Sequence, residues 1–107
     1  MDFSKLGQMK EIFEKAKDMQ ENIKKMKDEL DAKTFTGESG GGMVTVTMTG
    51  ARRCKKIEIA DICLQDKEMM QDLIVAAVNT VISKIDEEYK NELSNRSGLP
   101  NMGDLPF

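Results

Sequence analysis

The sequence predicts an α+β fold, in which a three-stranded antiparallel sheet lies between two long helices in the order α-β-β-β-α. Three patterns predict it: a heptad repeat of apolar residues over roughly 4–33, alternating apolar and polar residues between 35 and 60, and a mostly apolar helical segment over roughly 67–93. The 107-residue length suits one domain. We place this domain at residues 1–93 and expect residues 94–107 to form a flexible C-terminal tail.

The first helix is expected from roughly Ser4 to Lys33, because this segment contains no proline and a single glycine. Ser4 is the expected N-cap. About 30 helical residues span about 45 Å, so part of this helix should project from a body whose radius of gyration would be about 13 Å. Apolar residues spaced alternately by three and four form the a and d seam of a coiled coil: Met9, Ile12, Ala16, Met19, Ile23, Met26 and Leu30.

Lysines recur every seven residues beside this seam, and an acid follows each of them by four residues. The pairs are Lys10 and Glu14, Lys17 and Glu21, and Lys24 and Asp28. They form either a solvated face with weak ion pairs of about 0.2–0.5 kcal/mol each, or a row of lysines that contacts phosphates. Lysine before acid is the weaker order of the pair, which leaves the lysines loosely held.

Three short strands are expected after Lys33, where the period of the pattern changes. Phe35 to Glu38 and the alternating Met43 to Thr49 are the first two, and a third strand places Lys55, Ile57 and Ile59 on one face. Short glycine-containing turns between them indicate an antiparallel meander.

A glycine-rich stretch, GESGGG, separates the first two strands. A phosphate-binding P-loop requires a Gly-Lys-Ser/Thr sequence and a following helix. No lysine stands beside these glycines, and a strand follows them near Met43. The stretch is therefore expected to connect two strands.

The turn before the third strand, ARRCKK, carries four cations in five positions: Arg52, Arg53, Lys55 and Lys56. It is either a solubilising turn or a phosphate-contacting patch. No aromatic residue interrupts it, so base stacking is not expected there.

The second helix is expected over roughly Lys67 to Leu93, with Asp66 as its N-cap. Leu73 to Val78 is apolar around most of the helix, whereas a three-stranded sheet covers one side only. A second copy of the protein would supply the other cover, which predicts a homodimer. The candidate interface residues are Met70, Leu73, Ile74, Ala77, Val78 and Val81.

The residue types present argue against catalysis. The chain has no histidine, which excludes histidine-based triads, and its two cysteines, Cys54 and Cys63, are expected to be reduced thiols. No metal site, cofactor or small-molecule substrate is expected. Neither a signal peptide nor an apolar run of about 18 residues, the length that a membrane-spanning helix needs, is visible. This predicts a cytoplasmic protein without a membrane span. The net charge of −3 argues against a simple basic nucleic-acid binder.

Several stretches together resemble the YbaB/EbfC family of bacterial nucleoid-associated proteins: KAKDMQENIKKMKDEL, TGESGGGMVTVTMTG, KKIEIA, DKEMMQDLIVAAVNTVISKI and GLPNMGDLPF. The resemblance covers nearly the whole chain. It implies a small cytoplasmic protein of the nucleoid and a homodimer whose sheets and second helices pack centrally while other helices project like tweezers. It further implies double-stranded DNA binding, a link to nucleoid organisation and gene expression, and no enzymatic activity.

The resemblance does not fix which residues touch DNA, so we assign candidates by region and by charge. Beyond Ile85 the second helix is net acidic, which makes its end a doubtful contact. The alternative function is a protein-interaction adaptor that uses the heptad seam and binds DNA weakly or not at all. The candidate DNA-binding residues are Lys5, Lys10, Lys17, Lys24, Lys25, Lys27, Arg52, Arg53, Lys55 and Lys56.

Overall fold

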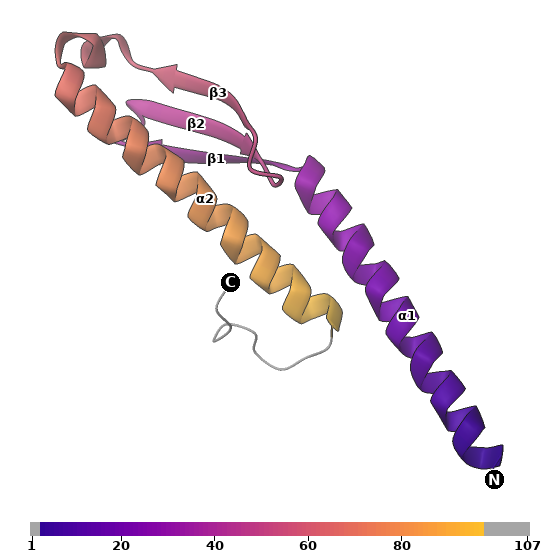
Figure 1. Ribbon diagram of the computed structural model, residues 1–107. Helices are drawn as coiled ribbons and strands as arrows, with labels where there is room; N and C mark the ends of the chain where they lie inside the picture. The colour runs from indigo at the N-terminus through magenta and orange to yellow at the C-terminus, as the bar shows by residue number, and fades with distance from the viewer. Residues whose placement is uncertain (1–2, 98–107) are drawn as a thin grey trace.

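The chain folds into two long helices joined by a small sheet (Figure 1). The computed structural model describes residues 3–97, with side chains described for residues 7–95. The elements in chain order are α1 (Phe3–Ala32), β1 (Thr34–Ser39), β2 (Val44–Thr49), β3 (Cys54–Ile59), a short 3-10 helix η1 (Asp61–Gln65) and α2 (Lys67–Ser97). This order confirms the predicted α-β-β-β-α fold, and among the described residues η1 is the one element that the sequence patterns did not predict.

Both helices differ slightly from their expected bounds. α1 begins at Phe3, so Ser4 lies inside the first turn and is not the N-cap. The N-cap of α2 is confirmed, because the Asp66 carboxylate accepts a hydrogen bond of 3.0 Å from the Met69 backbone N–H. α2 continues to Ser97, because polar residues extend a helix as well as apolar ones do and no proline or glycine occurs before Gly98. The domain boundary expected after residue 93 stays a prediction, and residues 98–107 of the expected tail lie outside the described residues.

The sheet is an antiparallel meander with the strand order β1-β2-β3. The glycine-rich stretch turns the chain from β1 into β2, as expected: Gly40, Gly41 and Gly42 have φ values of 60°, 67° and 92°, a region that favours glycine. A bulge follows the second turn. Thr47 pairs with Lys56 and Met48 pairs with Cys54, which leaves Lys55 as the extra residue of β3.

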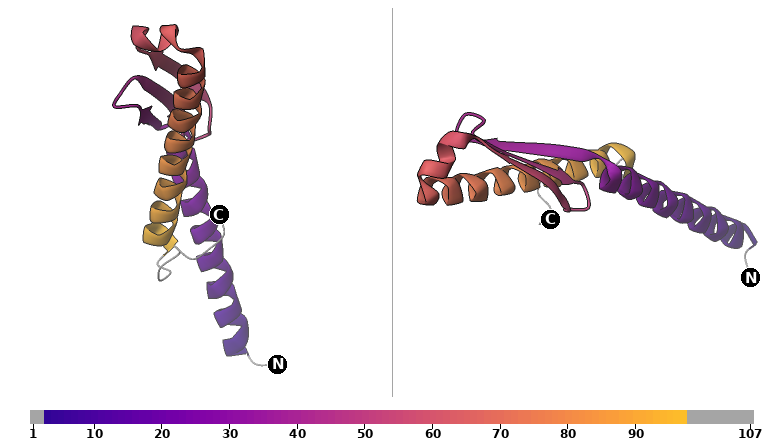
Figure 2. Two further views of the ribbon diagram at one scale, coloured as in Figure 1. Left: turned by 90° about the vertical axis from the view of Figure 1, so that its left-hand side faces the viewer. Right: turned by 90° about the horizontal axis from the view of Figure 1, so that it is seen from above.

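The core lies between α2 and one face of the sheet. Val44, Val46 and Met48 of β2 pack against a cluster that includes the fully buried Ala77 and Val81 of α2. Burying an aliphatic side chain of this size contributes about 1.5–3 kcal/mol. α2 packs on β1 and β2, and Figure 2 shows the helix running along one side of the sheet.

α1 projects from this body, as its length predicts. The described chain measures 78 × 25 × 16 Å and has a radius of gyration of 20.7 Å, well above that of a compact chain of this length. Only the C-terminal part of α1 is covered: Met26 and Leu30 are buried, whereas Met9, Ile12 and Met19 are exposed. The heptad seam is therefore divided into a packed part and an exposed part. The exposed part lies on the portion of α1 that extends away from the sheet in Figure 2.

Candidate nucleic-acid interface

The lysine row lies on the projecting part of α1. Lys10, Lys17 and Lys24 are all exposed, and within residues 7–95 none of them forms an ion pair. The i,i+4 pairs that the spacing allows are absent among these residues, which agrees with the weaker lysine-before-acid order. Their ammonium groups are thus presented to solvent along one side of a rod, an arrangement suited to contacting a polyanion.

The remaining candidate lysines of α1 divide by position. Lys25 and Lys27 are exposed near the packed end of the helix, and Lys27 lines a cleft there. Lys5 belongs to the first turns of α1, but its side chain lies outside the described ones.

The ARRCKK turn is less available than its sequence predicts. Arg52 forms an ion pair with Asp86 of α2, and the Lys56 ammonium lies 2.6 Å from the Glu58 carboxylate. The hydrogen bond from Lys56 to Glu58, together with the charge of that carboxylate, raises the pKa of Lys56 above its usual value. Arg53 and Lys55 are exposed and form no ion pair in the described part of the chain. Two of the four cations therefore already form ion pairs within the chain.

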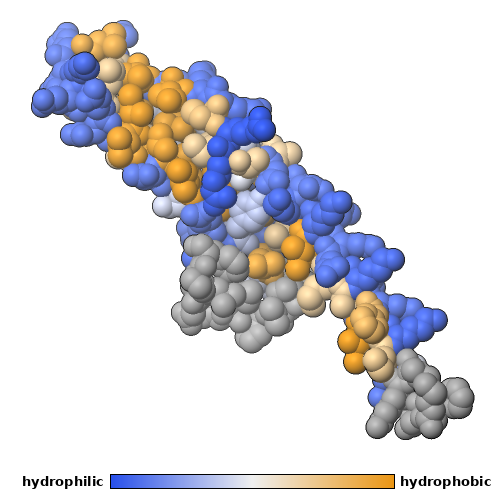
Figure 3. Space-filling view, in the orientation of Figure 1, coloured by the Kyte–Doolittle hydropathy of each residue, from blue (hydrophilic) through white to orange (hydrophobic). Residues whose placement is uncertain are grey.

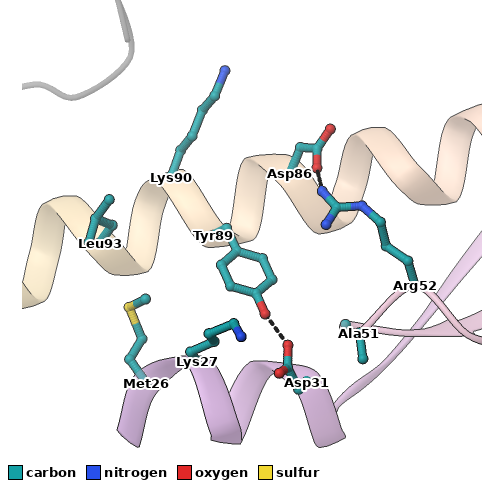
Figure 4. A pocket seen from close by; sticks show the side chains of 10 residues that line it. Met26, Lys27, Asp31, Ala51, Arg52, Asp86, Tyr89, Lys90 and Leu93 are labelled. Atoms are coloured by element: carbon teal, nitrogen blue, oxygen red, sulfur yellow. Dashed lines mark hydrogen bonds and ion pairs between the residues drawn. The ribbon is translucent and has the colours of Figure 1, made fainter. Parts of the chain in front are cut away.

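A cleft of about 510 Å³ lies where α1, α2 and the β2–β3 turn meet (Figure 4). Lys27, Arg52 and Lys90 line it, one from each of these three elements. At its floor the Tyr89 hydroxyl donates a hydrogen bond to the Asp31 carboxylate (Figure 4). Burial and this hydrogen bond raise the pKa of Tyr89 to about 12. This hydrogen bond links α2 to α1 across the cleft, and we call the contact between Tyr89 and Asp31 the joint.

The joint and the close packing beside it fix the position of the ARRCKK cations relative to the lysines of α1. A Cβ on Gly50 would lie 1.8 Å from the Leu30 carbonyl oxygen, so the β2–β3 turn lies directly against the last turns of α1. The ARRCKK turn therefore lies at the base of the projecting helix (Figure 1). Sequence reasoning did not identify Lys90 or the joint, because no local pattern relates Asp31 to Tyr89, 58 residues away.

The residues expected at a dimer interface lie mainly against the chain's own sheet. Ala77 and Val81 are fully buried within one chain, so they have no surface left for a second one. The other four are half-buried and pack against the same core: Met70, Leu73, Ile74 and Val78. The apolar stripe of α2 is used inside the chain, because the helix lies over β1 and β2.

A different apolar surface is exposed. Ile57 and Ile59 pair with Val46 and Val44, so they lie on the face of the sheet that carries α2, but α2 does not reach them. Figure 3 shows apolar residues gathered over this end of the molecule. We call this surface the β3 face; it consists of Ile57, Ile59, Ile62, Leu64 and Val75, which are 37–68% exposed.

No cluster of metal-binding groups occurs among residues 7–95. These residues contain no group of three or more histidine, cysteine or acidic side chains that could hold a metal ion. The two thiols are unpaired, with Cys54 exposed and Cys63 buried in the core. Within the described chain, neither helix is apolar over a stretch long enough to span a membrane.

Comparisons with known proteins agree with this architecture. The chain matches the model of the YbaB/EbfC DNA-binding family over residues 5–98. It is 41% identical to a nucleoid-associated protein of Xanthomonas euvesicatoria, over 94% of this chain and 98% of that protein. It is 38% identical to a nucleoid-associated protein of Xylella fastidiosa, over 94% and 97%. The crystal structure of an uncharacterized protein from Helicobacter pylori superposes with a TM-score of 0.69 at 32% identity, covering 92% of this chain and 99% of the other. The chain therefore belongs to the YbaB/EbfC DNA-binding family.

Proposed function

We propose that this protein is a cytoplasmic, nucleoid-associated protein that binds double-stranded DNA as a homodimer and thereby influences nucleoid organisation and gene expression. Membership of a DNA-binding family is the observation that carries the proposal. The names of its relatives, which are nucleoid-associated proteins, support the location. The projecting row of exposed lysines on α1 supports the mode of binding.

The lysine row is suited to the DNA backbone. Lys10, Lys17 and Lys24 recur every two helical turns, about 10.5 Å apart at about 1.5 Å per residue. Contacts of this kind set position on the duplex and carry no sequence information. With three lysines in each of two chains, the logarithm of the binding constant should fall with the logarithm of salt concentration with a slope no steeper than about −5.

The β3 face supports the homodimer. An exposed apolar surface that joins a sheet, η1 and a helix is typical of an interaction site. In a twofold dimer the same surface is used by both chains, so the β3 face of one copy would be covered by that of the other. This arrangement would also cover β3, whose edge away from β2 has no neighbouring strand in the described chain.

Reversal of the lysine row tests the DNA-binding proposal. The variant Lys10→Glu, Lys17→Glu, Lys24→Glu should bind duplex DNA at least about tenfold more weakly, because six phosphate contacts per dimer become repulsive. Fluorescence anisotropy at several salt concentrations measures this effect. Lys67→Glu is the matched control, because Lys67 is exposed at the start of α2, away from α1. If the triple variant stays folded and binds as the natural chain does, α1 is not the DNA contact.

A protein-interaction adaptor is the second candidate function. The projecting part of the heptad seam favours it, because Met9, Ile12 and Met19 are exposed at coiled-coil spacing. A folded dimer that binds no duplex DNA at low salt, and that retains one protein partner after nuclease treatment, would support the adaptor over the DNA-binding protein.

A further inference from the structure

Arg52 occupies a backbone conformation that its residue type rarely adopts. Its φ value is 63°, and it is the one residue other than glycine with a positive φ in the described chain. Glycine, asparagine and aspartate favour this left-handed region, whereas a longer side chain adopts it at a cost in energy. A residue that is kept in such a conformation is a candidate for a functional role of its side chain.

Hydrogen bonds hold the turn that carries Arg52 in place. The Arg52 backbone N–H donates a hydrogen bond of 2.8 Å to the Thr49 carbonyl oxygen, and the Arg53 backbone N–H donates one of 3.2 Å to the Thr49 hydroxyl. The Gly50 backbone N–H donates to the Lys33 carbonyl oxygen at 2.9 Å, which ties the turn to the residue that follows α1. The Arg52 side chain therefore starts from a fixed point at the base of the projecting helix.

Asp86 of α2 holds the guanidinium of Arg52 within the chain. The two side chains form an ion pair, and Figure 4 shows Arg52 reaching from its turn to the helix. Lys90, four residues after Asp86, extends away from α1 in Figure 4 and forms no ion pair within residues 7–95. Arg52 is therefore the cation that pairs with Asp86 in the described chain.

This ion pair is of a kind that a phosphate can replace. The side chains of Arg52 and Asp86 are 52% and 38% exposed, and exposed ion pairs contribute little to stability because water and salt screen them. A guanidinium binds a phosphate through two parallel hydrogen bonds, as it binds a carboxylate. A phosphate of a bound duplex and the Asp86 carboxylate would therefore compete for the same side chain.

The cleft with this ion pair lies at the end of the lysine row. Lys27, which lines the cleft, follows Lys24 by three residues, which is about 4.5 Å along α1 and about 60° around it. Arg52 lines the same cleft from the β2–β3 turn. A duplex backbone that follows the row from Lys10 toward the sheet therefore reaches Lys27 next, and then the cleft with Arg52.

We propose that Arg52 is a phosphate-binding residue of the DNA interface that Asp86 keeps occupied, so that Asp86 lowers the affinity of the chain for duplex DNA. This inference rests on the proposed DNA binding and assigns to Asp86 a role in setting its strength. In the natural chain the lysine row makes the phosphate contacts, and Arg52 stays on Asp86. Removing the charge of Asp86 releases the guanidinium, which adds one phosphate contact per chain at the base of α1.

Asp86→Asn tests the proposal, with Glu87→Gln as the charge-matched control. Each replacement removes one negative charge from neighbouring positions of α2, but Glu87 is exposed and forms no ion pair within residues 7–95. In fluorescence anisotropy at low salt, Asp86→Asn should bind duplex DNA at least about threefold more tightly than Glu87→Gln, because one more phosphate is contacted. The logarithm of its binding constant should also fall more steeply with the logarithm of salt concentration, by about 0.9 per chain.

The same replacements in an Arg52→Gln background separate the release of Arg52 from the mere loss of an acid near DNA. Without the guanidinium, Asp86→Asn and Glu87→Gln should have equal effects on the affinity and on the salt slope. Asp86→Ala, which also removes the hydrogen-bond acceptor, should bind at least as tightly as Asp86→Asn when Arg52 is present. Circular dichroism and sedimentation velocity measure whether each variant keeps its fold and its state of association.

Two results would overturn the proposal while leaving DNA binding intact. If the natural chain binds duplex DNA, equal affinities and slopes of Asp86→Asn and Glu87→Gln would show that Asp86 withholds no contact. A gain from Asp86→Asn that persists in the Arg52→Gln background would show that Asp86 acts by repelling DNA. If neither the natural chain nor Asp86→Asn binds duplex DNA at low salt, the proposed function itself fails, and this inference fails with it.

Discussion

Gly50 occupies a position in which the backbones of two elements meet. A Cβ there would lie 1.8 Å from the carbonyl oxygen of Leu30 and 2.6 Å from its carbonyl carbon. Both are backbone atoms, which cannot move aside as the end of a flexible side chain can. This single residue therefore allows the β2–β3 turn to approach the base of α1.

Replacement of Gly50 by alanine should destabilise the protein by about 1–3 kcal/mol or more, because the turn must move away from α1. The free energy of unfolding in urea measures the change. Gly7→Ala is the control: apart from its chain neighbours and the local helix backbone, no atom lies within 4 Å of the added methyl group, and alanine favours a helix over glycine by about 1 kcal/mol. Equal effects of the two replacements would contradict the close approach.

Tyr89 reports directly on the joint between the helices. Because its pKa is raised to about 12, the neutral hydroxyl contributes stability that is fully present below about pH 10 and is lost as the pH rises toward 12. The sequence contains one tyrosine and no tryptophan, so ultraviolet absorbance follows this residue alone. The titration midpoint should lie near 12 in the folded chain and near 10 in denaturant.

Asp31→Asn isolates the part of this pKa shift that the charge of Asp31 causes. The variant removes the charge beside Tyr89 while keeping a hydrogen-bond acceptor, so the midpoint should move from about 12 toward the usual value. A midpoint near 10 in the folded natural chain would show that the hydroxyl does not face Asp31 in solution.

At the scale of elements, α2 begins where its side-chain cap requires. The Asp66 carboxylate accepts the Met69 N–H, and η1 ends immediately before it. The helix then continues past the acidic run to Ser97, because nothing in that run breaks a helix. Helix bounds here follow caps and breakers rather than polarity.

Asp66→Ala should cost about 1 kcal/mol, within the range of about 0.5–2 kcal/mol for an N-cap. Thermal unfolding followed by circular dichroism measures the loss. Asp66→Asn should have a much smaller effect, because asparagine also caps helices. A loss equally large for asparagine would indicate that the charge of Asp66, and not the cap, is what stabilises α2.

The described part of the molecule exposes apolar surface at two places: the β3 face, and the projecting part of α1 with Met9, Ile12, Phe13 and Met19. The first lies on the body and the second on the projecting helix, so one partner surface would not fill both. We propose that a second copy of the chain covers the β3 face.

Ile57→Glu should convert the dimer to a monomer, because a carboxylate would be buried at the centre of the β3 face. Sedimentation velocity measures the state of association. Thr47→Glu is the matched control: it adds the same charge on the opposite face of the sheet, across from Lys56. A dimer that survives Ile57→Glu and remains folded would place the interface elsewhere.

The sequence by itself determined the order of elements, the cap of α2, the glycine turn and the projection of α1. Each of these follows from local rules, namely side-chain period, turn residues and the fixed rise of a helix. The family resemblance, later confirmed, also rests on residues in sequence order. The position of the lysine row also follows from a local rule, because heptad spacing alone places these lysines on one side of α1.

Only the tertiary structure decided which apolar and charged groups remain available. The helical pattern of α2 shows that more than one of its sides is apolar. It does not show that the side with Ala77 packs on the chain's own sheet, or that β3 remains exposed. The pairing of Arg52 with Asp86 and of Tyr89 with Asp31 likewise joins residues 34 and 58 positions apart. The physical reason is that burial and ion pairing depend on where α2 lies across the sheet, which no local pattern specifies.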